Sequence, residues 1–150
     1  MLTRVLDAVP LIRRVAPDLV FLVVAGPRID PRSLPRRRGA RTVGHVPDLT
    51  HLLAACDVAV VQGGLATCLE LTALQRPFLY VPLRHHFEQN IHVRRRLERY
   101  GAGTLLDYER LLEPDAFAAA LLAEVDREPA YLPVETDGAP RAAALLAELV

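Results

Sequence analysis

Three short apolar runs restrict the fold of this chain more than any other feature, and the second and third are each followed by a turn and then by residues with helical spacing. The runs start at Leu19, Val58 and Phe78 and read LVFLVVAG, VAVV and FLYV. Polar residues do not interrupt them, which is typical of strands that are covered on both faces in a parallel sheet. Because helical segments alternate with these runs, the sequence predicts an α/β fold, a Rossmann-like parallel sheet with helices on both faces.

Helical spacing and turn residues place the remaining elements. We expect helices over about 2–15, 48–56, 65–75, 87–100, from 114 onward and over 140–150, with short strands over 42–46 and 104–106. Pro10 is expected to kink or divide the first helix, because proline lacks the backbone donor and clashes with the preceding turn. The stretch 28–41 is rich in Arg and Pro, which is typical of an exposed loop. Ligands of such sheets bind beyond the carboxyl ends of the strands.

The composition indicates one domain over residues 1–150. A chain of 150 residues with 51% hydrophobic residues can bury a sizeable core. Eighteen basic and eighteen acidic residues cancel, so no overall field favours nucleic acid. No apolar run approaches the ~20 residues of a membrane-spanning helix, and two cysteines form no disulfide framework, so we expect a cytoplasmic protein without a transmembrane segment.

One predicted helix is strongly basic, which is typical of a solvated face and compatible with a partner or with peripheral membrane contact. Its basic residues are Arg94, Arg95, Arg96 and Arg99.

The turn after the second apolar run has the features of an anion-binding site. Gly63 and Gly64 carry no Cβ, so their backbone can approach a ligand closely. The helix expected from Leu65 adds unpaired N–H groups and the positive end of its dipole, which would suit a diphosphate. A second interpretation stays open, because Thr67 and Glu70 have the T-x-x-E spacing of a capping box that would satisfy the same N–H groups.

Polar residues also follow the third apolar run. That strand is expected to end at Pro82, and the next helix opens with Glu88, Gln89 and Asn90. Two neighbouring strand ends therefore carry polar groups at one edge of the sheet. The spacing of three histidines in this stretch fits no zinc signature, so we expect no metal site: His85, His86 and His92.

Together these segments resemble the C-terminal, donor-binding domain of GT-B glycosyltransferases. The family pattern is a strand ending in D-x-x-V, a turn G-G-x-x-T-x-x-E and, around the next strand, two prolines and an acidic–Gln pair. The matching residues are Asp57, Gly63, Gly64, Thr67, Glu70, Pro77, Pro82, Glu88 and Gln89, and GAGTLL from Gly101 continues the likeness. The pattern is similar to the lipid-II N-acetylglucosaminyltransferase type, glycosyltransferase family 28, and to the wider UDP-glycosyltransferases.

The resemblance implies a role for each position of the pattern. The residues that would hold the diphosphate of a nucleotide sugar are Gln62, Gly63, Gly64 and Thr67. Glu70 would accept hydrogen bonds from the ribose hydroxyls, since a carboxylate can engage both. The residues that would contact the sugar are Glu88, Gln89 and Asn90. The resemblance implies no cofactor, and it assigns no catalytic residue in this chain.

The activity implied is that of a hexosyltransferase, which moves a hexose or N-acetylhexosamine from a UDP-sugar or another NDP-sugar to an acceptor hydroxyl. In such enzymes a separate N-terminal domain binds the acceptor, and a strand precedes the first helix. We expect the acceptor domain, or an acceptor subunit, and that first strand to be missing from residues 1–150. Two alternatives remain, a non-catalytic nucleotide-sugar-binding or partner-dependent regulatory module, and a sugar-nucleotide epimerase or dehydrogenase. The dehydrogenase lacks support because G-x-G-x-x-G is absent.

Overall fold

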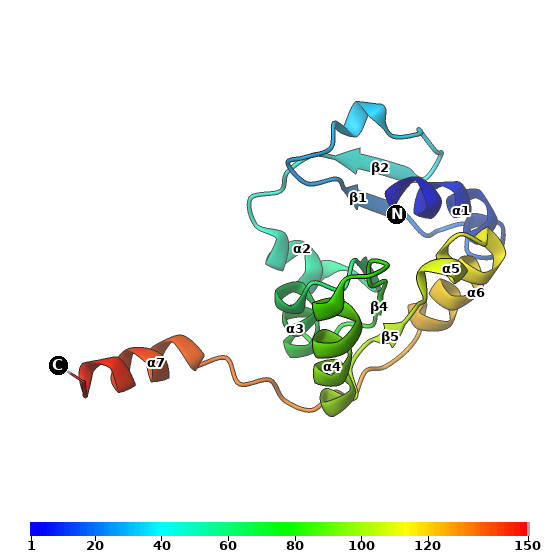
Figure 1. Ribbon diagram of the computed structural model, residues 1–150. Coiled ribbons are helices and arrows are strands. Elements are labelled where there is room, and N and C mark those ends of the chain that lie inside the picture. The colour runs from blue at the N-terminus through cyan, green and yellow to red at the C-terminus, as the bar shows by residue number, and fades with distance from the viewer. Residues whose placement is uncertain (150) are drawn as a thin grey trace.

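The computed structural model describes residues 1–149, in which helices and parallel strands alternate (Figure 1). In chain order the elements are α1 (Leu2–Val15), β1 (Phe21–Val24), a 3-10 turn (Pro31–Ser33), β2 (Ala40–Val43), α2 (Leu49–Ala55), β3 (Ala59–Val61), α3 (Leu65–Ala73), β4 (Phe78–Tyr80), a π-helical segment (Glu88–Val93), α4 (Arg94–Tyr100), β5 (Thr104–Leu105), α5 (Tyr108–Leu111), α6 (Pro114–Val125) and α7 (Gly138–Ala147). The expected alternation is confirmed. The expected helix over 87–100 differs, because its first part is π-helical.

The strands form two parallel sheets instead of one. β1 pairs with β2 in the first sheet, and the second sheet has the order β3-β4-β5. In the second sheet Val61 lies beside Tyr80, so the carboxyl ends of β3 and β4 are neighbours. The parallel direction of every strand agrees with the sequence prediction, but within residues 1–149 no ladder joins β1 to β3.

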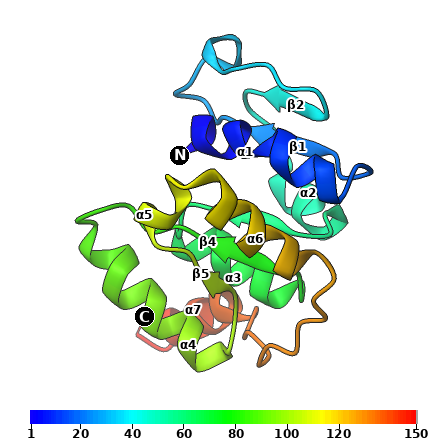
Figure 2. The ribbon, with the colours of Figure 1, turned by 90° about the vertical axis from the view of Figure 1, so that its right-hand side faces the viewer.

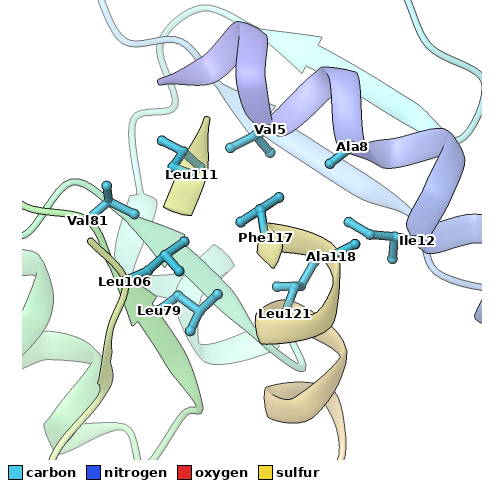
Figure 3. Packing of buried hydrophobic residues seen from close by; sticks show 10 residues of the cluster. All are labelled: Val5, Ala8, Ile12, Leu79, Val81, Leu106, Leu111, Phe117, Ala118 and Leu121. Atoms are coloured by element: carbon cyan, nitrogen blue, oxygen red, sulfur yellow. The ribbon is translucent and has the colours of Figure 1, made fainter. Parts of the chain in front are cut away.

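Two hydrophobic cores cover the two faces of β4. Leu79 belongs to the core that α1, α5 and α6 complete, whereas Phe78 and Tyr80 belong to the core that α2, α3 and α4 complete. Figure 3 shows the first core, in which Phe117 of α6 lies among side chains of α1 and α5 and next to Leu106, the residue that follows β5. Figure 2 shows α6 lying across β4 next to α1. The prediction of helices on both faces is therefore confirmed for the second sheet.

The first elements differ from the sequence prediction in two respects: the first helix is not divided at Pro10, and the first strand is not covered on both faces. α1 continues from Leu2 to Val15 through Pro10, because the residues that it buries against α6 hold the helix together despite the lost backbone hydrogen bond. β1 is not covered on both faces: Val20 and Leu22 are 78% and 47% exposed. The face that carries these two residues belongs to neither hydrophobic core.

The closing helix stands apart from the rest of the chain. α7 follows an extended stretch and projects away from both sheets (Figure 1), and it contains no buried residue. Leu145 and Leu146 are each 64% exposed. The helix expected over 140–150 is thus present over Gly138–Ala147, and Val150 lies outside the described residues.

Buried ionisable groups make the stability of the fold sensitive to alkaline pH. Burial raises the pKa of the Cys68 thiol from 9.0 to about 12 and that of the Tyr80 hydroxyl from 10.0 to about 12. Both groups stay protonated in the folded protein while they ionise in the unfolded chain. Their stabilising contribution is therefore complete below pH 9 and is lost as the pH rises from about 9 toward 12, at up to about 1.4 kcal/mol per pH unit for each ionising group.

We expect urea unfolding at a series of pH values to show this decline. In Cys68→Ala the decline between pH 9 and 12 should be shallower, because the Cys68 thiol no longer contributes, while Cys56, Tyr80 and Tyr131, whose pKa values burial also raises, remain. A Cys68→Ala variant whose stability falls with the same pH profile as the unmodified chain would contradict the assignment.

Candidate functional site

Gly63 and Gly64 form the turn at the carboxyl end of β3. Gly63 is buried with φ +80°, a conformation that side chains rarely adopt, and a Cβ there would lie 3.6 Å from the backbone of Pro82. The turn therefore packs against the residues that follow β4, which brings the two predicted strand ends together. Gly64 has φ −70° and ψ 134°, and a Cβ there would meet no atom within 4 Å. The backbone of Gly64 faces open space.

The N-terminus of α3 has no side-chain cap. Gly64 is the N-cap residue, so no side chain of the cap accepts from the first N–H groups of the helix. Thr67 and Glu70 both lie inside α3, beyond the cap position. The capping-box interpretation of T-x-x-E is therefore wrong, because its threonine would have to be the N-cap residue. Unpaired N–H groups and the positive end of the helix dipole lie beside the open space at Gly64.

Thr67 and Glu70 share one face of α3, since residues three apart in a helix are neighbours. Both side chains are half-buried, and no hydrogen bond or ion pair within residues 1–149 engages either of them. A rise of 1.5 Å per residue places Glu70 about 4.5 Å further along the helix axis than Thr67. Cys68, Leu71 and Thr72 are the buried residues of the helix, on its core side. Gln62, in the turn, is exposed and also free of such contacts.

The predicted sugar-contacting residues lie at the start of the π-helical segment, and two of them also brace the loop after β4. Gln89 Oε1 accepts a hydrogen bond from Leu83 N–H at 2.9 Å. Asn90 Nδ2 donates to the carbonyl oxygens of Leu83 and His86, both at 2.8 Å. The amide nitrogen of Gln89 and the amide oxygen of Asn90 remain available. Glu88 is exposed and makes no hydrogen bond within residues 1–149.

Arg84 is a cation in this loop that the sequence reasoning missed. Its Nε lies 2.8 Å from Glu109 Oε1, and its guanidinium lies 5.2 Å from the ring centroid of Tyr108. These contacts tie the loop to α5, while Gln89 and Asn90 tie it to the π-helical segment. No local signal identifies Arg84, because its partners are far along the chain. The sequence reasoning also missed Phe87. Its side chain is 66% exposed, and the centroid of its ring lies 5.2 Å from that of the His92 ring in an edge-on arrangement.

The arrangement combines a glycine turn, an uncapped helix N-terminus and unpaired polar side chains at the carboxyl edge of a parallel sheet. The profile of the glycosyltransferase family 28 C-terminal domain matches residues 3–148. The chain belongs to this family. The resemblance carried by the G-G-x-x-T-x-x-E turn is thereby confirmed, and so is the expected α/β fold of a GT-B C-terminal half.

Solved structures share the fold of this family 28 domain. Spinosyn rhamnosyltransferase SpnG, solved with thymidine diphosphate and with spinosyn aglycone, is 24% identical in sequence with a TM-score of 0.57 in both cases. Each match covers 97% of this chain and 40% of SpnG. Spinosyn forosaminyltransferase SpnP is 27% identical with a TM-score of 0.46, over 95% of this chain and 39% of SpnP. The comparison with curated proteins returns no match.

This domain thus spans 40% of the length of SpnG. Within residues 1–149, every helix is too short or too polar to span a lipid bilayer. The residues that the sequence analysis predicts to contact the phosphates, the ribose and the sugar all lie in the stretch 62–90, at the ends of β3 and β4.

Proposed function

We propose that this domain binds the nucleoside diphosphate of a sugar donor, with a UDP-sugar as the first candidate, and forms the donor half of a hexosyltransferase. The observation that carries the proposal is the open space at Gly64, beside the uncapped N-terminus of α3. A diphosphate in that space would accept hydrogen bonds from the free N–H groups and would be stabilised by the helix dipole.

The same interactions explain how the domain would assist the reaction. An acceptor hydroxyl attacks the anomeric carbon of the sugar, the bond from that carbon to the diphosphate oxygen breaks, and negative charge develops on the leaving group. Fixed N–H groups that point at this charge lower the barrier, because they need no reorganisation during the step. Thr67 would add a hydroxyl donor from the first turn of α3.

The acceptor site and the general base would come from a second domain or subunit. This division rests on the coverage of the solved enzymes, of which this chain matches 40% or less. The same fact favours a second candidate function, a nucleotide-sugar-binding module that regulates a partner without catalysing transfer. Nucleotide binding is common to both candidates, so the first experiment measures binding.

Glu70 would recognise the ribose. Its free carboxylate lies on the same helix face as Thr67 and further from the helix N-terminus, as a ribose lies further from the sugar than the diphosphate does. Glu88, Gln89 and Asn90 would contact the sugar from the other strand end. Gln89 would do so through its amide nitrogen, since its amide oxygen already accepts a hydrogen bond from the Leu83 N–H.

We expect a comparison of UDP with dUDP to isolate the ribose contact. These ligands differ only in the 2′-hydroxyl, so the unmodified chain should bind UDP more tightly, by about tenfold or more, because a hydrogen bond to a charged group contributes about 1.5–3 kcal/mol. Glu70→Ala should lose that difference and bind both ligands with similar, weaker affinity. Isothermal titration calorimetry measures the affinities of UDP and dUDP for the unmodified chain and for Glu70→Ala.

The matched control is Glu128→Ala, which removes an exposed carboxylate outside the site. It should leave both affinities unchanged. Equal discrimination between UDP and dUDP in Glu70→Ala and in the unmodified chain would disprove the ribose assignment. Absence of UDP binding by the unmodified chain would disprove the UDP proposal, and dTDP and ADP then test other nucleotides.

A further inference from the structure

A cavity of about 510 Å³ lies between β2 and the segment that connects β1 to β2. Ala40 and Thr42 of β2 form one wall, and the opposite wall comes from residues 31–37. The 3-10 turn of this segment lies on the side of β2 away from β1 (Figure 1 and Figure 2). None of the residues that line the cavity belongs to the stretch 62–90, so it is separate from the candidate nucleotide site. We call it the arginine cavity, after Arg32, Arg36 and Arg37 in its wall.

The arginine cavity carries an excess of positive charge. Residues 28–41 contain six arginines and one acidic residue, in a chain whose charges cancel overall. The guanidinium of Arg37 is paired, because its Nη2 lies 2.8 Å from Asp7 Oδ1. No ion pair or hydrogen bond within residues 1–149 engages the guanidinium of Arg32 or Arg36. A free guanidinium suits an anion with several oxygens, which its planar N–H groups can engage in pairs.

The connecting segment holds these charges in a folded wall. The Asp30 carboxylate accepts from the Arg32 N–H at 2.9 Å and caps the 3-10 turn, and Ser33 Oγ donates to Asp30 O at 2.7 Å. The ion pair of Arg37 with Asp7 ties the other end of the segment to α1. A ligand would therefore meet a wall that is already formed, which reduces the ordering entropy lost on binding.

Thr42 adds two hydrogen-bond donors from the opposite wall. Val43 O accepts from Ala25 N–H at 2.9 Å, so Val43 faces β1. Backbone groups of successive strand residues point to opposite sides, so the Thr42 N–H points to the outer edge of β2, where the 3-10 turn lies. Within residues 1–149, β2 pairs only with β1, and neither the N–H nor the hydroxyl of Thr42 has a hydrogen-bond partner.

We propose that the arginine cavity binds the phosphate group of a phosphate ester. Arg32 and Arg36 engage the phosphate oxygens, and Thr42 donates to them from its N–H and hydroxyl. A phosphate monoester has three terminal oxygens and nearly two negative charges, which matches two free guanidiniums better than a singly charged carboxylate does.

The organic part of the ester also has a place in the cavity. The volume lies within the range of about 300–1,000 Å³ that is typical of small-molecule sites and exceeds what a phosphate ion alone needs. Pro31, Leu34 and Ala40 line the cavity with apolar surface that this part can contact. Soluble phosphate esters and phospholipid headgroups carry the same group, so the test has an arm for each.

Phenyl phosphate is the soluble probe, titrated into the ¹⁵N-labelled chain while the amide signals are followed by NMR. We expect saturable shifts of the Ala40 and Thr42 amides, and phenol, which lacks the phosphate, should not shift them. The signals of Gly64 report separately on the candidate nucleotide site. The outcome therefore does not depend on whether that site binds a nucleotide.

Two double variants test the role of the free charges. Arg32→Gln/Arg36→Gln should weaken phenyl phosphate binding by about tenfold or more, because it removes two charged donors. The variant should fold normally, since both side chains are exposed. The matched control is Arg95→Gln/Arg96→Gln, which removes two exposed charges on α4 and should change the affinity by less than about twofold, since salt screens distant charges. Thr42→Val removes only the hydroxyl and should weaken binding by about threefold.

Vesicles that contain phosphatidic acid are the lipid probe, and vesicles of phosphatidylcholine alone are their control. Cosedimentation with the phosphatidic acid vesicles that is lost in Arg32→Gln/Arg36→Gln, and kept in the α4 variant, assigns the phosphate to a lipid headgroup. A chain that stays in the supernatant while it binds phenyl phosphate assigns the site to soluble esters.

Two results would overturn the proposal. In the first, a saturating excess of phenyl phosphate leaves the Ala40 and Thr42 amides unshifted, whatever the vesicles do. In the second, both double variants weaken phenyl phosphate binding equally, which would mean that the overall charge attracts the anion and that the cavity does not hold it.

Discussion

Replacing Phe117 with alanine is expected to lower the free energy of unfolding by about 3–5 kcal/mol, because it removes a buried aromatic ring and leaves a cavity. Phe117 is fully buried, and it lies between α1 and β4 in the core that Figure 3 shows. Small domains have total stabilities of about 5–15 kcal/mol, so the variant is expected to be partly unfolded at elevated temperature. Urea unfolding followed by circular dichroism measures the loss.

Phe87→Ala is the matched control for this prediction. Phe87 is 66% exposed, so removal of its ring should change the free energy of unfolding by no more than about 0.5 kcal/mol. A loss below about 1 kcal/mol in Phe117→Ala would mean that α6 does not hold α1 against the sheet, since core truncations of this size cost several times more.

Gly64→Val is expected to keep the fold and to lose nucleotide binding. The φ and ψ of Gly64 lie in the extended region that valine adopts readily, and the space around its Cβ position is empty. The change should cost at most about 1 kcal/mol of stability through the weaker N-cap. The added side chain would fill the space that we assign to the diphosphate, so UDP affinity should fall by about a hundredfold or more.

Gly63→Ala separates strain from obstruction at the same turn. Alanine at φ +80° costs about 1–2 kcal/mol, so this variant should lose stability, and its UDP affinity should fall less than that of Gly64→Val. Calorimetric UDP titrations and urea unfolding measure both properties in both variants. Unchanged UDP affinity in Gly64→Val would show that the diphosphate binds elsewhere.

The local elements of the site could be predicted because their causes are local. Uninterrupted β-branched runs predict buried parallel strands, and β4 is buried on both faces. Asp48 was expected to open a helix, and its carboxylate accepts from His51 N–H at 3.2 Å at the start of α2. Two consecutive glycines predict close backbone approach, and the turn at Gly63 packs against Pro82.

Other features depend on partners that are distant in the sequence. Whether Thr67 caps a helix depends on where α3 starts, and the start at Leu65 places Thr67 inside it. Gln89 and Asn90 were assigned to the sugar from their pattern, but their hydrogen bonds to Leu83 and His86 follow from the path of the loop. The ion pair between Arg84 and Glu109 forms because α5 lies near the loop that follows β4.

The sequence by itself determined the alternation of strands and helices, the glycine turn and the family. These features depend on residues that are close together in the sequence, through their apolar periodicity and through the backbone conformations that glycine allows. The tertiary structure decided which surfaces are covered. It showed that the sheet is divided between β1 and β3, that α7 packs on nothing within residues 1–149 and that the N-terminus of α3 is open. The reason is physical: burial and hydrogen-bond pairing are properties of surfaces that meet in space, and the spacing of residues along one chain does not specify which surfaces meet.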